Sequence, residues 1–378
     1  MPVPLPRRPA IGLRCAAAPG GGALVRELRA GGAAAALLRP GDRLLALDER
    51  PISDPALLVA LLRGRRAGEL LRLRVARGDQ LLVLELRLED LPHETCPDAH
   101  VLYDSIEVAG VRLRTITVRP RGPGPHPAWL LLPGLACASQ DFAVAPGHPL
   151  RPLVAALAGA GVVTMRVERP GVGDSEGGPC EALGFLAERD VFAVGLAALR
   201  AGADVDPEAL GLFGHSVGGM LAPLLAGAGE VRRIAVYGSC AAPWPQVLRR
   251  SAERQAARTG EDIDALVAGA RTGRDPCFSE ELTAIDLAAA WSRVSADVLV
   301  VRGELDQAVA DVDARALADL LAARPRGWSG FLEVPGADHD LGVHPDLAAS
   351  LRAPGGGAAC PALLAALARF ARGLPPCP

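Results

Sequence analysis

Lysine is missing from this 378-residue chain, so all 40 of its basic side chains are arginine. A P-loop needs a lysine beside the nucleotide phosphates, and the absence of lysine excludes that class of nucleotide site. The arginines nearly balance 43 acidic residues and leave a net charge of −3, which favours neither nucleic acid nor an anionic membrane as a partner. We interpret the arginine bias as compositional and not as a recognition surface.

Long apolar runs, a secretory signal and metal-type cysteine spacing are also absent. No apolar run reaches the roughly 18 to 20 residues that a membrane-spanning helix needs. The N-terminal stretch has no apolar segment of the kind that signal peptides carry. The eight cysteines are scattered, with neither a CxxC pair nor a Cys/His metal motif. We therefore expect a cytoplasmic protein with reduced, mostly buried thiols, without a metal or an organic cofactor.

Small aliphatic residues are what the chain has in abundance. Half of the residues are apolar but only 3% are aromatic, a balance that suits an α/β protein with a core of small side chains. The length exceeds that of one compact core and predicts two domains. We predict a first domain at 1–90, a linker with two prolines at 91–100, and a second domain at 101–378.

The first domain is predicted to be a small α+β unit, with strand-like segments separated by turn residues and two helical segments. The predicted strands are 23–28, 43–48, 69–76 and 80–88, and the predicted helices are 31–38 and 56–63. The stretch GALVRELRAGGAAAALLRPGDRLLALDERPI, together with the helix and strands that follow it, resembles a PDZ domain of the bacterial, protease-associated kind.

This resemblance implies a peptide-binding role for the loop of Ile11, Gly12 and Leu13. Backbone N–H groups of that loop would receive the carboxylate of a peptide C-terminus, and the peptide would add to the sheet as an extra strand. The alternative is a domain that only packs beside the second domain or shapes access to its site.

In the second domain, strand-like segments alternate with helices, which predicts a mostly parallel sheet covered by helices on both faces. Strands are predicted at 104–108, 111–118, 129–132, 162–167, 210–213, 233–237, 298–301 and 330–334, and helices at 150–160 and 182–200. Mostly helical residues at about 241–295 interrupt this alternation, and we predict that they form a cap inserted over an active site.

Two serines lie in the pattern G-x-S-x-G, Ser175 and Ser216. A strand precedes Ser216 and a helix starts directly after it, the setting in which a serine is exposed on a strained turn beside a helix N-terminus. Gly214 and Gly218 supply the small neighbours that such a turn requires. After Ser175 and Glu176 comes Gly-Gly-Pro, which does not start a helix at once, so we favour Ser216 as the nucleophile.

The second domain resembles the α/β-hydrolase family, from about residue 103 to residue 374. The motifs that carry the resemblance are PGLACAS, RPGVGDSEG, GHSVGG, RGELDQ and GADHD, in this order. The resemblance implies the chain order nucleophile, acid, base. By position, Asp306 is the acid with Glu304 as the alternative, and His339 is the base with His344 as the alternative.

The oxyanion hole is expected to use two backbone amides, those of Val217 and Leu135. Family members often have His-Gly where this chain has Pro133 and Gly134. We predict a serine hydrolase that cleaves a small-molecule carboxylic ester, or a related acyl bond, through an acyl-enzyme. The alternatives are a peptidase or amidase guided by the PDZ-like domain, and a non-catalytic peptide-binding scaffold.

Overall fold

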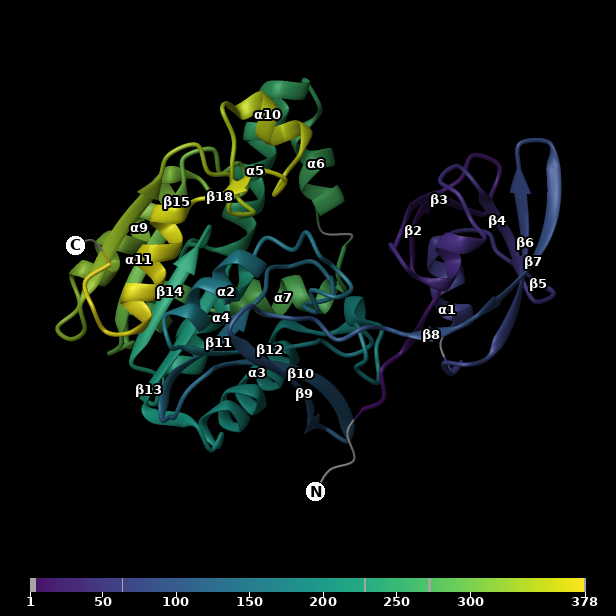
Figure 1. Ribbon diagram of the computed structural model, residues 1–378. Helices are drawn as coiled ribbons and strands as arrows, with labels where there is room; N and C mark the ends of the chain where they lie inside the picture. Colours follow the sequence, from purple (N-terminus) through teal and green to yellow (C-terminus); the bar gives the residue numbers. More distant parts are fainter. Residues whose placement is uncertain (1–4, 63, 228, 271–272, 377–378) are drawn as a thin grey trace. The chain divides into compact units, whose positions relative to one another are not determined.

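The computed structural model describes residues 5–62, 64–227, 229–270 and 273–376. The chain divides into two compact units (Figure 1). The smaller unit is Pro6–His93, and the larger contains Leu5 and the residues from Glu94 onward. Each unit has its own apolar core.

The smaller unit is built on an antiparallel sheet with the strand order β2-β3-β4-β6-β7. These strands are β2 (Leu13–Ala17), β3 (Ala23–Leu28), β4 (Arg43–Leu47), β6 (Leu70–Arg77) and β7 (Gln80–Arg87). The short β5 (Arg50–Pro51) pairs with β4, and β1 (Pro9–Ala10) pairs with β8 (Glu89–Asp90). Alternate residues of β6 are buried and exposed, as expected for a sheet with one covered face.

The helix α1 (Pro55–Leu62) packs its Leu58 and Leu61 into the core of this unit. The helix predicted at 31–38 is instead a single 3-10 turn, η1 (Ala33–Ala36). Its four alanines lie between a glycine pair and the Pro40 turn, and a single i to i−4 bond, from the Leu38 amide to the Ala34 carbonyl at 2.8 Å, follows it.

The larger unit contains an eight-stranded sheet with the order β16-β15-β14-β13-β11-β12-β10-β9. All neighbours from β12 to β16 along this path are parallel, whereas β9 and β10 form an antiparallel hairpin at one edge. The bounds are β9 (Ala99–Val108), β10 (Val111–Pro120), β11 (His126–Leu132), β12 (Val163–Val167), β13 (Val205–His215), β14 (Arg233–Tyr237), β15 (Asp297–Gly303) and β16 (Ser329–Val334).

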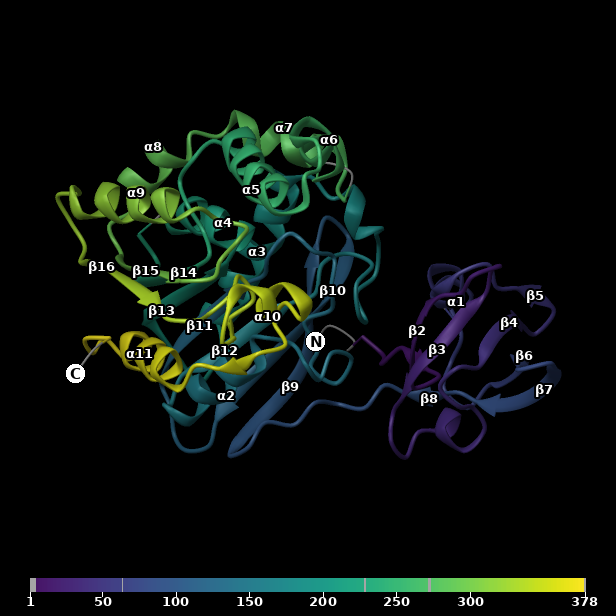
Figure 2. The ribbon, with the colours of Figure 1, turned by 90° about the horizontal axis from the view of Figure 1, so that it is seen from above.

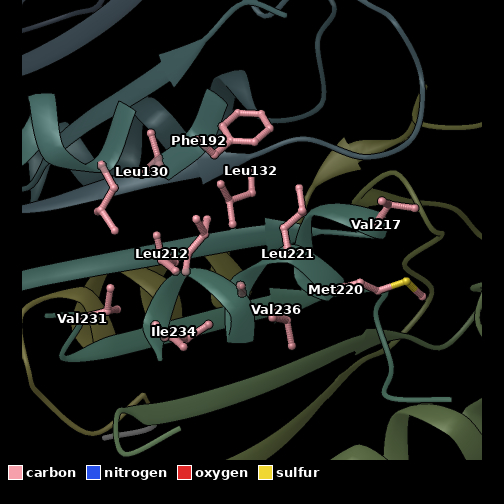
Figure 3. Close-up of a cluster of buried hydrophobic side chains, with 14 of the residues drawn as sticks. Leu130, Leu132, Phe192, Leu212, Val217, Met220, Leu221, Val231, Ile234 and Val236 are labelled. Atoms are coloured by element: carbon pink, nitrogen blue, oxygen red, sulfur yellow. The ribbon is translucent and has the colours of Figure 1, made fainter. Parts of the chain in front are cut away.

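Helices cover both faces of this sheet (Figure 2). On one face lie α3 (Phe185–Arg200), α4 (Val217–Ala226) and α9 (Asp311–Ala322), and on the other lie α2 (Arg151–Gly159) and α11 (Pro361–Ala371). Successive residues of a strand point to opposite faces, so Leu130 and Leu132 join the first core, shown in Figure 3, while Trp129 and Leu131 join the second. Burial on both faces explains the uninterrupted apolar runs of the central strands.

In the described part of the segment between β14 and β15 there are four helices: α5 (Trp244–Thr259), α6 (Ile263–Ala270), α7 (Pro276–Ala284) and α8 (Leu287–Ser292). After β16 come β17 (Gly342–Val343), α10 (Leu347–Arg352) and β18 (Ala358–Ala359). The short η2 (Cys180–Ala182) precedes α3. Among the described residues, no helix combines the length and the apolar character that crossing a membrane requires.

The expectation of eight reduced thiols is wrong for one pair, because Cys137 and Cys180 form a disulfide. They are 43 residues apart in sequence, and the fold brings the loop after β11 next to η2. Spacing in the sequence carries no sign of this contact. Five other cysteines of the described residues are free, and Cys377 lies outside them. Reduced thiols were one of our reasons for predicting a cytoplasmic location. The disulfide removes that reason, and the location stays a prediction.

Replacing Cys137 and Cys180 together with serine is expected to lower the free energy of unfolding by about 4 kcal/mol, since a crosslink over a loop of this length restricts the unfolded chain. Urea unfolding without reductant measures the loss. A Cys360→Ser variant, which removes a half-buried free thiol, is the control. Equal unfolding midpoints for the double variant and the wild type would contradict the prediction.

Candidate active site

The turn between β13 and α4 holds Ser216 in a strained backbone conformation, with φ 55° and ψ −122°. Positive φ is uncommon for residues other than glycine and marks functional turns. A Cβ atom on Gly218 would lie 2.1 Å from the Leu132 carbonyl oxygen, and one on Gly214 would lie 2.5 Å from the Gly219 Cα. Only glycine fits at either position, so the two glycines are a steric requirement of the turn.

Ser175, the serine of the second G-x-S-x-G match, is completely buried in the loop after β12. Its Oγ accepts a hydrogen bond from the Arg114 amide (2.9 Å) and donates one to the Glu168 carbonyl (3.0 Å). The hydroxyl thus joins this loop to β10, and its burial keeps it from a substrate.

The carboxyl ends of three parallel strands bring the proposed triad to one edge of the sheet. Ser216 follows β13, Asp306 follows β15 and His339 follows β16. The His339 Nδ1 lies 2.9 Å from Asp306 Oδ2. The other carboxylate oxygen of Asp306 accepts hydrogen bonds from the amides of Ala308 and Val309, at 2.8 and 2.9 Å. Both oxygens of this buried acid are therefore engaged, which fixes its orientation.

The charges of this pair shift both of its pKa values. Burial by itself would lower the pKa of His339, but the charge and hydrogen bond of Asp306 raise it above its ordinary value. Burial would likewise raise the pKa of the Asp306 carboxyl, but the charge and hydrogen bond of His339 lower it overall, with help from the two backbone amides. Asp306 is therefore ionised at neutral pH and stabilises a protonated His339.

The alternative acid and the alternative base have other partners. Glu304 accepts a hydrogen bond from the Gly336 amide (2.8 Å) and braces the turn after β16. The buried His344 lies with its Nε2 2.9 Å from Asp338 Oδ2. Asp338 in turn accepts from the amides of Asp340 and Gly342. Glu304 and His344 thus organise the loop that carries His339.

His215, directly before Ser216, is a site residue that the sequence reasoning missed. Its Nε2 lies 2.8 Å from the His339 carbonyl oxygen, and the centroids of the two imidazole rings are 5.0 Å apart. A carbonyl only accepts, so Nε2 carries the proton. Burial, together with the charge of His339, lowers the pKa of His215 to about 4, so the ring is neutral at pH 7. Its position next to the nucleophile was the available signal.

The loop after β11 lies against the Ser216 turn, as the proposed oxyanion hole requires. A Cβ atom on Gly134 would be 3.2 Å from His215 Nδ1 and 3.4 Å from Ser216 Cβ. Among the described residues, the Leu135 amide donates no hydrogen bond. Val217 is the first residue of α4, where helical N–H groups have no acceptor within the helix. Both amides are thus available to an oxyanion.

In the smaller unit, the predicted carboxylate loop precedes the edge strand β2. Ile11 is buried, Gly12 has φ +80°, and Leu13 begins β2. The Gly12 carbonyl accepts a hydrogen bond from the Arg29 amide at 2.8 Å, which fixes the loop to the end of β3. Among the strands that the structure describes, β2 pairs with β3 alone, so its outer edge has the geometry for strand addition.

The fold of the larger unit is that of an α/β-hydrolase, and the comparisons with known proteins agree. The sequence profile of the alpha/beta hydrolase family matches residues 129–351, more than half of the chain. The chain therefore belongs to the α/β-hydrolase family. A PDZ domain profile matches residues 9–88, so a PDZ domain precedes the hydrolase domain.

Solved structures with related folds are 14–18% identical in sequence to this chain, a level that shows the fold alone. One of two fungal esterases from Rhizomucor miehei has a TM-score of 0.53, 18% identity and coverage of 74% of this chain and 85% of its own. DcsB in complex with a substrate analogue has a TM-score of 0.52 and 17% identity, covering 73% and 98%. A hypothetical protein from Pseudomonas aeruginosa has a TM-score of 0.52 and 14% identity, covering 73% and 94%. No curated protein sequence matches the chain significantly.

Proposed function

We propose that the protein is a serine hydrolase of small-molecule carboxylic esters, with Ser216, His339 and Asp306 as its catalytic triad. The observation that carries the proposal is the contact of the buried Asp306 with the half-buried His339, 2.9 Å apart, at the sheet edge where Ser216 occupies a strained turn. A serine hydroxyl is a weak nucleophile until a base removes its proton, and a base is effective when an acid orients it.

In the proposed reaction, Ser216 Oγ attacks the ester carbonyl while His339 Nε2 takes the serine proton. The Nδ1–H group of His339 donates a hydrogen bond to Asp306, whose negative charge stabilises the imidazolium. His339 then protonates the leaving alcohol. The amides of Val217 and Leu135 stabilise the tetrahedral oxyanion. Water, activated by the same histidine, releases the acid from the acyl-enzyme. A thioester would react through the same residues.

A second candidate function, hydrolysis of a peptide or amide bond, is favoured by the PDZ domain. The domain has an open edge at β2 and a loop of Ile11, Gly12 and Leu13 that could receive a peptide C-terminus. It would then deliver a chain to the hydrolase domain. A third, a peptide-binding scaffold without activity, is disfavoured because all three triad residues are present.

Hydrolysis of a series of p-nitrophenyl acyl esters, compared with cleavage of a peptide library, tests the proposal. We expect ester turnover that varies with acyl length. Cleavage of peptides alone would replace the ester proposal with the second candidate function, and binding of peptides without any turnover would leave the scaffold.

The pH profile of kcat/KM is expected to have an acid limb above the ordinary histidine pKa of about 6.5. His339 must be neutral to act as a base, and Asp306 outweighs burial and raises its pKa. Activity therefore falls as the pH drops through that raised value. Asp340 also raises the pKa of His339, so an Asp340→Asn variant is expected to move the limb to lower pH. A limb below pH 6.5 in the wild type would contradict this assignment.

A further inference from the structure

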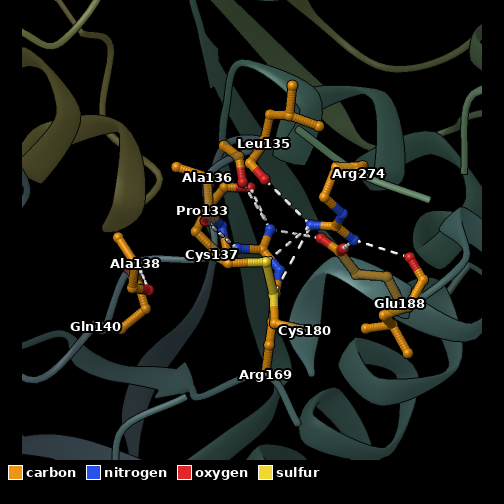
Figure 4. The surroundings of a disulfide bond; sticks show 12 residues. Pro133, Leu135, Ala136, Cys137, Ala138, Gln140, Arg169, Cys180, Glu188 and Arg274 are labelled. Carbon is orange, nitrogen blue, oxygen red and sulfur yellow. Dashed lines mark hydrogen bonds and ion pairs between the residues drawn. A yellow bond between two sulfur atoms is a disulfide. The ribbon is translucent and has the colours of Figure 1, made fainter. Parts of the chain in front are cut away.

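Two buried arginines bind four successive backbone carbonyls of the loop that precedes the disulfide (Figure 4). Arg169 follows β12, and Arg274 precedes α7. Arg169 donates to the carbonyls of Pro133 (3.4 Å), Gly134 (2.6 Å) and Ala136 (2.8 Å), and Arg274 donates to that of Leu135 (3.1 Å). The first three of these residues, 133–135, are the predicted oxyanion loop.

Glu188 of α3 joins the two arginines. Its Oε1 lies 2.5 Å from Arg169 Nη2, and its Oε2 lies 2.6 Å from Arg274 Nη2. Its side chain is completely buried, and those of the arginines are nearly so. Buried charges require partners. One carboxylate paired with two guanidinium groups leaves a net charge of one positive unit. The four carbonyl oxygens, which are the negative ends of their dipoles, stabilise this charge.

Because the peptide bond is planar, an arginine that binds a backbone carbonyl also fixes the direction of the N–H group of the next residue. In a trans peptide, the C=O of one residue and the N–H of the next lie in one plane and point in opposite directions. The Gly134 carbonyl points to Arg169, so the Leu135 N–H points away from it. Since Gly134 lies against Ser216, a rotation of this one peptide would remove the proposed oxyanion donor.

We propose that Arg169 and Arg274 are positioning residues that hold the oxyanion loop in its active conformation, with Glu188 as their shared counter-ion. The inference rests on the proposed function. Arg274 comes from the helical segment between β14 and β15, and the neighbouring Asp275 amide donates to the Glu181 carbonyl at 2.8 Å. Arg169 fixes the Gly134–Leu135 peptide, which carries the proposed donor, and Arg274 fixes the next peptide, Leu135–Ala136, so the two arginines hold Leu135 from both sides.

The test compares Arg274→Met with Arg114→Met in ester hydrolysis. In the first variant Glu188 keeps Arg169 as its partner, so no buried charge is left alone. Loss of one oxyanion donor lowers kcat by about 100- to 1,000-fold. A misoriented donor should have a smaller effect, so we expect Arg274→Met to lower kcat by about 10- to 100-fold and to leave KM within about 3-fold. The rate of fluorophosphonate labelling should fall in parallel, because that reaction also builds charge on an oxygen in the oxyanion hole.

Arg114 is the matched control, a buried arginine that pairs with Asp174 and donates to backbone carbonyls away from the oxyanion loop. Arg114→Met is expected to lower the Tm but to keep kcat within about 3-fold.

If Arg274→Met does not fold, Arg274→Lys is the second variant. It keeps the charge and one donor, and it should lower kcat without a change in KM. If the wild type hydrolyses the ester and the folded Arg274 variant has the same kcat, the positioning role is wrong and the proposed function stands. A wild type without ester turnover overturns the proposed function, and this inference falls with it.

Discussion

The Ser216→Ala variant is expected to lose ester hydrolysis by a factor of about 10⁴ to 10⁶ in kcat, the range seen when a triad nucleophile is removed. The methyl group of alanine cannot attack a carbonyl, and no acyl-enzyme forms. Binding of the ester should persist, because the substitution removes one oxygen and keeps the backbone of the turn. The measurement is steady-state hydrolysis of a p-nitrophenyl ester, with the folded state checked by circular dichroism.

Ser175→Ala is the matched control, since Ser175 lies in the second copy of the same sequence pattern. Its buried hydroxyl joins the Arg114 amide to the Glu168 carbonyl. Loss of these bonds should cost about 1 to 3 kcal/mol of stability and leave kcat nearly unchanged. Loss of activity in Ser175→Ala with retention in Ser216→Ala would reverse the choice of nucleophile.

The Asp306→Asn variant is expected to lower kcat by about 10⁴-fold through the tautomer of His339. The amides of Ala308 and Val309 donate to Asp306 Oδ1, so the asparagine oxygen takes this place and its NH₂ group faces His339. The Nδ1 of the imidazole must then accept a hydrogen bond, which moves its proton to Nε2. A ring protonated on Nε2 cannot remove the serine proton.

Glu304→Gln is the control for this variant, because Glu304 was the alternative acid and its side chain contacts the Gly336 amide instead. A glutamine keeps an acceptor for that amide, so activity should stay within about 3-fold of the wild type. A larger loss in Glu304→Gln than in Asp306→Asn would identify Glu304, and not Asp306, as the acid of the triad. Both variants are measured by kcat and KM with the same ester.

The order of strands and helices could be predicted from the sequence because buried parallel strands produce uninterrupted apolar runs between amphipathic helices. The segments predicted at 233–237 and 298–301 correspond to β14 and β15. The proposed triad came from the resemblance to the family, and it stays a prediction; each of its members lies in the turn or loop after a parallel strand. Parallel strands place their carboxyl ends at one edge, which brings His215 into contact with His339, 124 positions further along the chain.

Contacts that depend on how loops pack could not be predicted. The Cys137–Cys180 disulfide joins two loops whose sequences show no pairing signal. Arg169, Glu188 and Arg274 come from a loop, a helix and the helical insertion, and each looks like an ordinary surface charge in a chain with 40 arginines. Their burial appears only when the elements are assembled. His215 differs, because its position next to Ser216 was visible in the sequence.

A fluorophosphonate modifies the nucleophile of a serine hydrolase, and mass spectrometry of the digested wild-type protein locates the modified residue. We expect one phosphonylated residue, Ser216, with labelling lost in Ser216→Ala and kept in Ser175→Ala. Labelling that persists unchanged in Ser216→Ala, or that maps to Ser175 or another residue, would contradict this expectation.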